Sequence, residues 1–314
     1  MTDRPFQRIL VPLDGSRLAE AIIPAASGLA QVCGGEILLL HALEREPPEE
    51  VHGEPHLRSM ADATAYLEAL ARALRDLGLK ARSFVVTADQ GSVADCIAQQ
   101  AAALAADLIA MTTHGSGGLR GVLFGRIAQQ VLQRAERPTL VLRSRRARRE
   151  PGGPATSLVP ASYRRILVPL SGEPSSAQVL PLVWKLAQCT GAEVMLARVV
   201  PVLGSLSLRE SVPTVFLPTA SAALLELEED EARAALDRLA AGAQPGTITS
   251  VAVRRGETID ELRELARQAD LVIMVTHGRA GLEGWLSGST AARLLAQVSI
   301  PLLLVPVGWL GQAG

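Results

Sequence analysis

Two pairs of glycines give this chain its clearest capacity to bind a ligand. Gly115 and Gly125 are separated by nine residues, and Gly278 and Gly288 repeat that spacing. The first glycine of each pair permits positive φ and a close approach of a ligand to the backbone. The second opens a helix, whose first amides favour phosphate. The spacing predicts a phosphate-binding loop in each half, and a loop that serves only as a turn and helix cap is the alternative.

The residue after the second glycine differs between the two loops. Ser289 and Thr290 bring hydroxyl donors to a helix start, where the helix dipole is positive. Arg126 stands at the corresponding place in the first loop. Its guanidinium is suited either to contact a phosphate or to fill the pocket and pair with Asp14, and the sequence leaves both interpretations open.

Asp14 follows a strand-like run in the segment Pro12-Leu-Asp-Gly-Ser16. Open parallel sheets bind ligands beyond the carboxyl ends of their strands, so this carboxylate is a candidate ligand contact. The alternative is that Asp14 and Ser16 only cap the next helix.

Several other chemistries find no support. The two lysines follow Leu79 and Trp184, so the Gly-Lys-Ser/Thr of a Walker loop is absent, and neither glycine loop has the dinucleotide spacing G-x-G-x-x-G. No catalytic triad, paired carboxylates or H-E-x-x-H occurs, which leaves at most slow hydrolysis of a bound nucleotide. The close pair His52 and His56 lacks further ligands and is expected in an exposed loop rather than a metal site.

The chain contains two copies of one unit. Arg8–Leu13 and Arg165–Leu170 are identical, and Thr113-His-Gly returns as Thr276-His-Gly. So long a repeat indicates a duplicated domain rather than a solenoid. The segment between the copies is rich in charge, Gly and Pro, as linkers are. Two domains, at 1–143 and 164–308, and a linker at 144–163 are therefore predicted.

Short apolar runs alternate with longer segments of helical period in both copies. The runs are apolar on both faces, as buried parallel strands require. Strands are predicted at Ile9–Leu13, Glu36–Leu43, Ala81–Thr87, Asp107–Thr113, Thr139–Leu142, Ile166–Leu170, Glu193–Val200, Thr247–Arg254, Leu271–Thr276 and Leu302–Val305. Helices of the first copy are predicted at Arg17–Val32, Ser59–Leu77, Ser92–Ala105 and Arg126–Ala135. The order predicts an α/β fold of two tandem doubly wound domains, each with a five-stranded parallel sheet.

These motifs together resemble the universal stress protein family, with two such domains in one chain. The marks are Ile-Leu-Val-Pro-Leu-Asp-Gly-Ser at 9–16, the Thr-His-Gly motif in both copies, and Pro-Thr-Leu-Val-Leu at 138–142. The nucleotide-binding branch of that family carries G-x2-G-x9-G-[S/T]. Here Thr112 and Val275 replace the first glycine, and Arg126 replaces the final hydroxyl that Ser289 retains.

The resemblance implies an adenine-nucleotide alpha-hydrolase-like fold that binds ATP, with Mg²⁺ possible where Asp14 permits, in a stress-response regulatory module. Ser171 takes the place of Asp14 in the second copy and cannot supply a carboxylate to a metal. The nucleotide site that the resemblance implies comprises Pro12, Asp14, Ala42, Thr113, Gly115, Gly125, Arg126, Pro169, Ser171, Val199, Thr276, Gly278, Gly288, Ser289 and Thr290.

Two other interpretations remain beside nucleotide binding. The family also has a nucleotide-free branch, and the replaced motif residues favour an interaction protein with degenerate sites. The other interpretation is an enzyme of a related adenine-nucleotide fold, but the sequence lacks the catalytic signature that such an enzyme would need. In the family single domains pair through their last strands, so Thr139–Leu142 and Leu302–Val305 are expected to meet as an internal pseudo-dimer, with a homodimer of chains possible.

Composition limits the partners further. The net charge of -1, from 31 basic and 32 acidic residues, gives no global attraction to nucleic acid or an anionic membrane. No apolar segment has the length of a membrane span or signal peptide. Three widely spaced cysteines favour a reducing, cytoplasmic setting over a disulfide framework.

Overall fold

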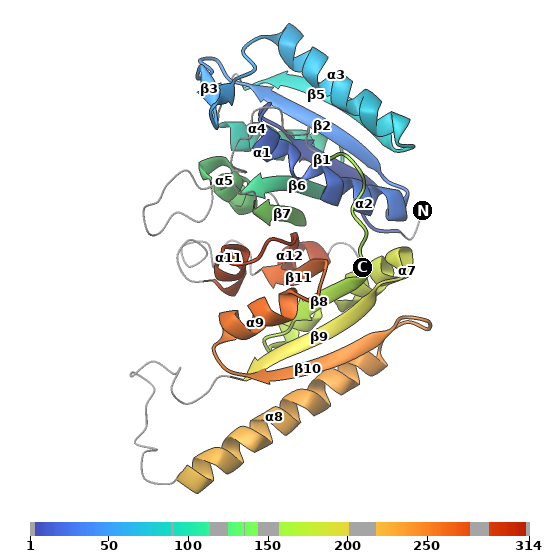
Figure 1. Ribbon diagram of the computed structural model, residues 1–314, viewed down its shortest axis with the longest axis vertical. Coiled ribbons are helices and arrows are strands. Elements are labelled where there is room, and N and C mark those ends of the chain that lie inside the picture. Colours follow the sequence, from blue (N-terminus) through green and yellow to red (C-terminus); the bar gives the residue numbers. More distant parts are fainter. Residues whose placement is uncertain are drawn as a thin grey trace.

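The computed structural model describes residues 4–88, 91–113, 125–134, 136–143, 157–200, 218–276 and 289–311 (Figure 1). Its strands are β1 Arg8–Pro12, β2 Glu36–Leu43, β3 Glu50–Val51, β4 Glu54–Pro55, β5 Lys80–Thr87, β6 Leu108–Thr113, β7 Thr139–Arg143, β8 Arg165–Pro169, β9 Glu193–Val200, β10 Thr249–Arg255, β11 Leu271–Thr276 and β12 Leu302–Pro306. Its helices are α1 Arg17–Glu20, α2 Ile23–Cys33, α3 Met60–Asp76, α4 Val93–Ala103, α5 Arg126–Arg134, α6 Pro174–Ala177, α7 Leu180–Thr190, α8 Pro218–Ala241, α9 Thr258–Ala266, α11 Thr290–Leu295 and α12 Val307–Leu310.

One sheet of ten strands runs through both halves, in the order β10-β9-β8-β11-β12-β7-β6-β1-β2-β5. The five strands of each half are mutually parallel. In the first half β1 lies at the centre, with β2 and β5 to one side and β6 and β7 to the other. In the second half β8 lies at the centre, with β9 and β10 to one side and β11 and β12 to the other. The predicted fold class, two tandem doubly wound α/β domains, is confirmed.

The two halves join through their last strands, as expected. β12 pairs antiparallel with β7, so that Leu302 lies opposite Val141 and Leu304 opposite Thr139. The Arg143 guanidinium, at the end of β7, donates a hydrogen bond to the carbonyl of Ala296. Antiparallel pairing of two equivalent strands is what a local twofold axis between the halves requires.

The helices cover both faces of the sheet because its strands are apolar on both sides. All six residues of β6 are buried. One face packs against α2, α3, α7 and α8, and the other against α4, α5, α9 and α11. No helix in the described part of the chain combines the length and apolar character needed to cross a membrane.

A partly buried carboxylate fixes the start of the central strand in each half. Asp107 accepts hydrogen bonds from the backbone amides of Gln7 and Arg8, at 2.7 and 3.0 Å. Asp270 does the same for Arg164, just before β8, and for Arg165, its first residue, at 2.8 and 2.9 Å. Burial raises the pKa of Asp107, and these hydrogen bonds oppose that rise. Equivalent strands therefore begin in equivalent positions.

Two local features differ from the predicted elements. The helix expected at Arg17–Val32 is divided into α1 and α2. Pro24 lies in the first turn of α2, where its missing N–H costs no helical hydrogen bond, whereas within one continuous helix it would remove a hydrogen bond and clash with the preceding turn. The hairpin of β3 and β4 was not predicted, since two-residue strands have no usable periodicity.

Candidate functional site

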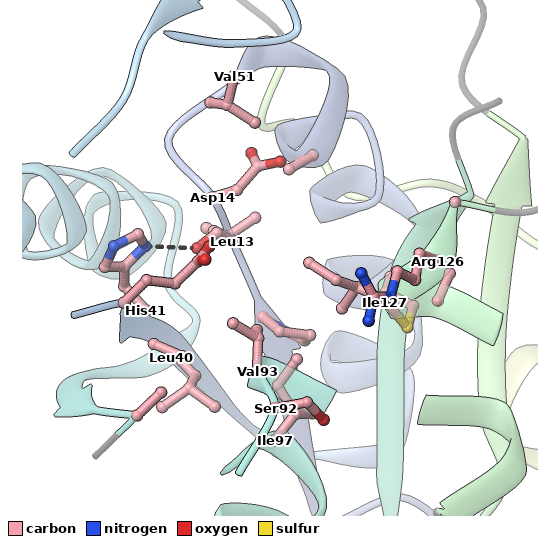
Figure 2. A pocket seen from close by; sticks show the side chains of 18 of the residues that line it. Leu13, Asp14, Leu40, His41, Val51, Ser92, Val93, Ile97, Arg126 and Ile127 are labelled. Carbon is pink, nitrogen blue, oxygen red and sulfur yellow. Dashed lines mark hydrogen bonds between the residues drawn. The ribbon is translucent and has the colours of Figure 1, made fainter. Parts of the chain in front are cut away.

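A cavity of about 880 Å³ lies at the carboxyl ends of the strands in the first half (Figure 2). The ends of β1, β2 and β6, the starts of α4 and α5, and the β3–β4 hairpin form its wall. This volume falls within the range of pockets that hold small-molecule ligands. The position matches the rule that open parallel sheets bind ligands beyond their carboxyl edge.

Five of the predicted site residues line this cavity: Pro12, Asp14, Ala42, Gly125 and Arg126. They come from three separate parts of the chain, which the parallel order of β2, β1 and β6 brings together.

Two neighbouring residues at the end of β6 have different places. Thr112, which replaces the first glycine of the motif, lines the cavity. Thr113 is buried and does not line it, and its hydroxyl oxygen finds no hydrogen-bond partner within the described residues. Gly115 lies outside the described residues.

Asp14 combines the two roles that the sequence left as alternatives. Its Oδ1 accepts hydrogen bonds from the backbone amide and the hydroxyl of Ser16, at 2.9 and 2.6 Å. Ser16 Oγ in turn accepts from the amide of Ala19 and caps α1. The other carboxylate oxygen, Oδ2, lies 3.5 Å from Nε2 of His52. Asp14 thus orders the turn and also presents negative charge to the cavity.

Arg126 begins α5, whose first turn closes through a hydrogen bond from the amide of Gln129 to the carbonyl of Gly125. The first amides of a helix have no acceptor within it, so they face the same end of the cavity as the arginine. Arg126 is exposed, and no ion pair or hydrogen bond ties it to another described residue, Asp14 included. Figure 2 shows Arg126 and Asp14 on different sides of the cavity.

The structure adds His41, which the sequence reasoning missed. His41 is buried near the end of β2, and its Nδ1 lies 2.8 Å from the carbonyl oxygen of Leu13 (Figure 2). A carbonyl only accepts, so Nδ1 carries the proton and Nε2 is left with a lone pair. Nε2 is buried without a hydrogen-bond partner among the described residues. The available signal was a single polar residue within the apolar run Ile37–Leu43.

Burial keeps His41 neutral. Desolvation lowers the pKa of His41, while the hydrogen bond to Leu13 opposes the shift. The neighbouring His56, whose ring centroid lies 5.9 Å away, lowers the pKa of His41 as well. A neutral imidazole in this position offers a hydrogen-bond acceptor rather than a cation.

The expectation that His52 and His56 lie in an exposed loop is wrong. The β3–β4 hairpin folds them onto the cavity wall, with Gly53 in its turn at φ +80°. His56 is buried, and its Nδ1 lies 2.9 Å from the carbonyl of Leu57. Within the described residues, no group of three or more His, Cys, Asp or Glu side chains is placed to hold a metal.

The start of α4 supports the wall opposite the hairpin. Ser92, which lines the cavity, forms a capping box with Asp95. Asp95 also forms an ion pair of 2.7 Å with Arg134 at the end of α5. This ion pair links α4 to α5, the helix whose start is predicted to bind phosphate.

The second half offers a different set of groups at the equivalent edge. Ser171 Oγ accepts from the backbone amide of Glu173 at 3.3 Å, and Ser289 Oγ caps α11 by accepting from the amide of Ala292 at 3.2 Å. Thr290 follows as the first residue of α11. Pro169, Val199 and Thr276 end β8, β9 and β11 or lie next to their ends. Gly278 and Gly288 lie outside the described residues.

Arg198 occupies the place in β9 that His41 has in β2. Gly172, the counterpart of Gly15, has φ +93°, and a Cβ there would lie 2.7 Å from the guanidinium carbon of Arg198. The arginine therefore packs against the turn that follows β8, close to Ser171. Its side chain carries donors only, in contrast to the acceptor of His41.

The family model described as "Universal stress protein family" matches residues 5–143 and 162–306. A relative from Thermus aquaticus, "Universal stress protein in QAH/OAS sulfhydrylase 3'region", is 33% identical over 147 aligned positions, and the match covers 44% of this chain and 99% of the relative. A solved structure from Pseudomonas aeruginosa PAO1, of unknown function, covers 98% of this chain and 96% of its own, with 17% identity and a TM-score of 0.65. A universal stress protein in complex with cAMP covers 45% of this chain and 99% of its own, with 18% identity and a TM-score of 0.36.

Each of the two family matches spans the five strands of one half, and the Pseudomonas structure has the same fold over nearly the whole length. The chain belongs to the universal stress protein family and carries two of its domains in tandem.

Proposed function

We propose that the first half binds an adenine nucleotide, ATP by preference, and that the protein is a stress-response regulatory module rather than an enzyme. The observation that carries this proposal is the cavity of about 880 Å³ at the strand ends, whose wall includes both Asp14 and Arg126. Binding of ATP would change which partners the protein associates with.

The cavity wall divides into an apolar part and a charged part. Pro12, Leu40 and Ala42 come from neighbouring strand ends and offer backbone groups and apolar surface to a base. Gly125 and Arg126 offer helix amides and a cation, which suit phosphate. This separation of apolar and cationic groups supports a nucleotide better than an apolar ligand or a simple anion.

The donor set suits Mg²⁺ only when it is bound together with a triphosphate. Asp14 contributes a carboxylate, and Mg²⁺ is commonly held by one or two carboxylates plus substrate phosphates. Bound in this way, Mg²⁺ would neutralise part of the triphosphate charge. Arg126 supplies a second, metal-independent positive charge at the start of α5.

Calorimetric titration with ATP and Mg²⁺ tests the proposal. The expected result is saturable binding to wild-type protein that weakens by at least ~10-fold in Arg126→Ala, which corresponds to the loss of about 1.4 kcal/mol. Arg72→Ala removes the same charge from an exposed position of α3 that does not line the cavity, and it should bind like wild type. Absence of binding to wild type, without bound nucleotide in the purified protein, would instead support a nucleotide-free interaction protein.

A further inference from the structure

A pair of cysteines lies where the two halves meet. Cys33 is the last residue of α2, and Cys189 is the last but one of α7. These helices hold equivalent positions in the two halves and lie side by side, with Cα atoms that approach within 8 Å (Figure 1). Both cysteines belong to one apolar cluster that is continuous between the halves.

The two side chains are direct neighbours. The Cys189 side chain lies close enough to the Cys33 thiol to raise its pKa, and both cysteines are in the free form. Cys33 is buried, and Cys189 is partly exposed. The third cysteine, Cys96, lies in α4, a helix that covers the opposite face of the sheet. The pair is therefore separated from the remaining thiol by the sheet itself.

We propose that Cys33 and Cys189 form a reversible disulfide that joins the two halves when the protein meets a hydroperoxide. A disulfide forms where two cysteines of suitable direction already approach one another, and α2 and α7 provide that approach. The site is distinct from the nucleotide cavity, and the inference does not depend on nucleotide binding.

The reaction proceeds in two balanced steps. In the first, the sulfur of Cys189 attacks the peroxide; the O–O bond breaks, a sulfenic acid forms, and water or an alcohol leaves. In the second, the sulfur of Cys33 attacks the sulfur of Cys189 and forms the S–S bond. The hydroxyl group leaves with the proton of Cys33 as water. The two thiols lose two electrons in total, and the peroxide gains them.

The order of attack follows from exposure. Burial raises the pKa of the Cys33 thiol, and the contact with Cys189 raises it further. Cys33 therefore stays protonated and shielded, whereas Cys189 is accessible to an oxidant in solution. Cys189 is the residue that the peroxide meets first, and Cys33 resolves the sulfenic acid.

The location defines what the disulfide would change. α2 and α7 end at the amino edge of the sheet, whereas the nucleotide cavity lies at the carboxyl edge (Figure 1). A bond there constrains the joint between the halves and leaves the cavity open. It also closes a long loop of the chain, which restricts the unfolded state.

Peptide mapping of the full-length protein after treatment with hydrogen peroxide and alkylation tests the inference. Trypsin places Cys33 in peptide 18–45, Cys189 in peptide 186–198 and Cys96 in peptide 83–120. The expected product is peptide 18–45 linked to peptide 186–198, which separates on reduction. The oxidised protein should migrate with the mass of one chain on a non-reducing denaturing gel, and it should unfold at a higher urea concentration than the reduced protein.

Three variants make the result specific. Cys189→Ala should abolish both the linked peptide and the shift in urea, while Cys96→Ala should retain both. Cys33→Ala, which removes the resolving thiol, should leave a sulfenic acid at Cys189 that a dimedone probe captures. Diamide, which drives disulfide formation without peroxide chemistry, serves as a second oxidant. Absence of the linked peptide with both oxidants, or a link that includes Cys96, would overturn the inference.

Discussion

The two halves share a backbone and differ in the side chains at its carboxyl edge. In the first half the amide of Leu13 donates to the carbonyl of Leu40, and in the second the amide of Leu170 donates to the carbonyl of Ala197, both at 2.8 Å. Each turn is followed by a glycine with φ of +90° or +93°. The position of the candidate site is therefore set by the sheet, which is the same in both halves.

The polar groups placed on this common backbone are different. His41 and Asp14 in the first half correspond to Arg198 and Ser171 in the second. At the following helix, Arg126 corresponds to Ser289. The first half thus combines the carboxylate of Asp14 with the cation of Arg126 at a helix start. The second half has no carboxylate at the equivalent position, and its cation, Arg198, lies on a strand. One duplicated scaffold presents two chemistries because a few strand-end residues were exchanged.

The largest expected effect comes from reversing the charge at the start of α5. Arg126→Glu puts a carboxylate beside the proposed phosphates, and we expect ATP affinity to fall by at least ~100-fold, or about 2.8 kcal/mol. Calorimetry measures this loss. Ser289→Glu makes the equivalent change in the second half and should leave first-half binding intact. Equal losses in both variants would contradict the assignment of ATP to the first half.

The next effect concerns the joint between the halves. Gly28 in α2 occupies the position that Lys185 has in α7. A Cβ on Gly28 would lie 2.2 Å from the carbonyl oxygen of Ala161, a backbone atom that can give way only if the chain itself shifts. Gly28→Ala should therefore lower the free energy of unfolding by about 2 kcal/mol, as overpacking does. Urea denaturation measures it. Gly308→Ala has open space around the new Cβ and is the control; an equal loss there would refute the steric explanation.

A smaller effect is expected from copying the second half into the first at Asp14. Asp14→Ser removes the carboxylate proposed to support Mg²⁺, so ATP affinity with Mg²⁺ should fall by about 10-fold, or about 1.4 kcal/mol. Affinity in EDTA should change less. Titrations with and without Mg²⁺ make this comparison. Asp14→Asn, which keeps an acceptor for Ser16, separates loss of charge from loss of the turn; unchanged Mg²⁺ dependence in both variants would argue against a metal contact.

The smallest effect is a pH dependence of stability due to His41. Burial lowers the pKa of His41 in the folded chain, so the unfolded chain takes up the proton first as the pH falls below about 6.5. Protonation of the unfolded state reduces stability below that pH, by at most about 1.4 kcal/mol per pH unit. Urea denaturation between pH 7 and 5 should show this decline in wild type. His41→Phe should flatten it, and an unchanged slope would assign the effect to other groups.

The sequence was sufficient for the sheet because its strands are apolar on both faces. The predicted strands Glu36–Leu43, Glu193–Val200 and Leu271–Thr276 have the observed bounds of β2, β9 and β11. Helix ends were found where caps mark them, as at Ser59 and Ser92. The division of α1 from α2 was missed because Pro24 falls in a segment whose apolar period continues through it.

Part of the cavity wall was predicted, whereas nucleotide binding by these residues stays a prediction. Asp14 could be placed because the parallel topology fixes the carboxyl edge of the sheet, and Pro12 and Ala42 were placed by the resemblance to the universal stress protein family. The β3–β4 hairpin and His52 could not, since their position depends on contacts between segments distant in the sequence rather than on local periodicity. The sequence likewise could not show that Nε2 of His41 lacks a hydrogen-bond partner among the described residues. That follows only from the structure, in which Nδ1 of the same ring donates to the carbonyl of Leu13.

A crystal structure from crystals grown with ATP and Mg²⁺ is the most direct test of nucleotide binding in the first half. The predicted result is ATP in the first-half cavity, with the base near Pro12 and Ala42 and the phosphates at Arg126 and the first amides of α5. An empty cavity at saturating ATP, or ATP bound only elsewhere on the protein, would contradict the proposed function.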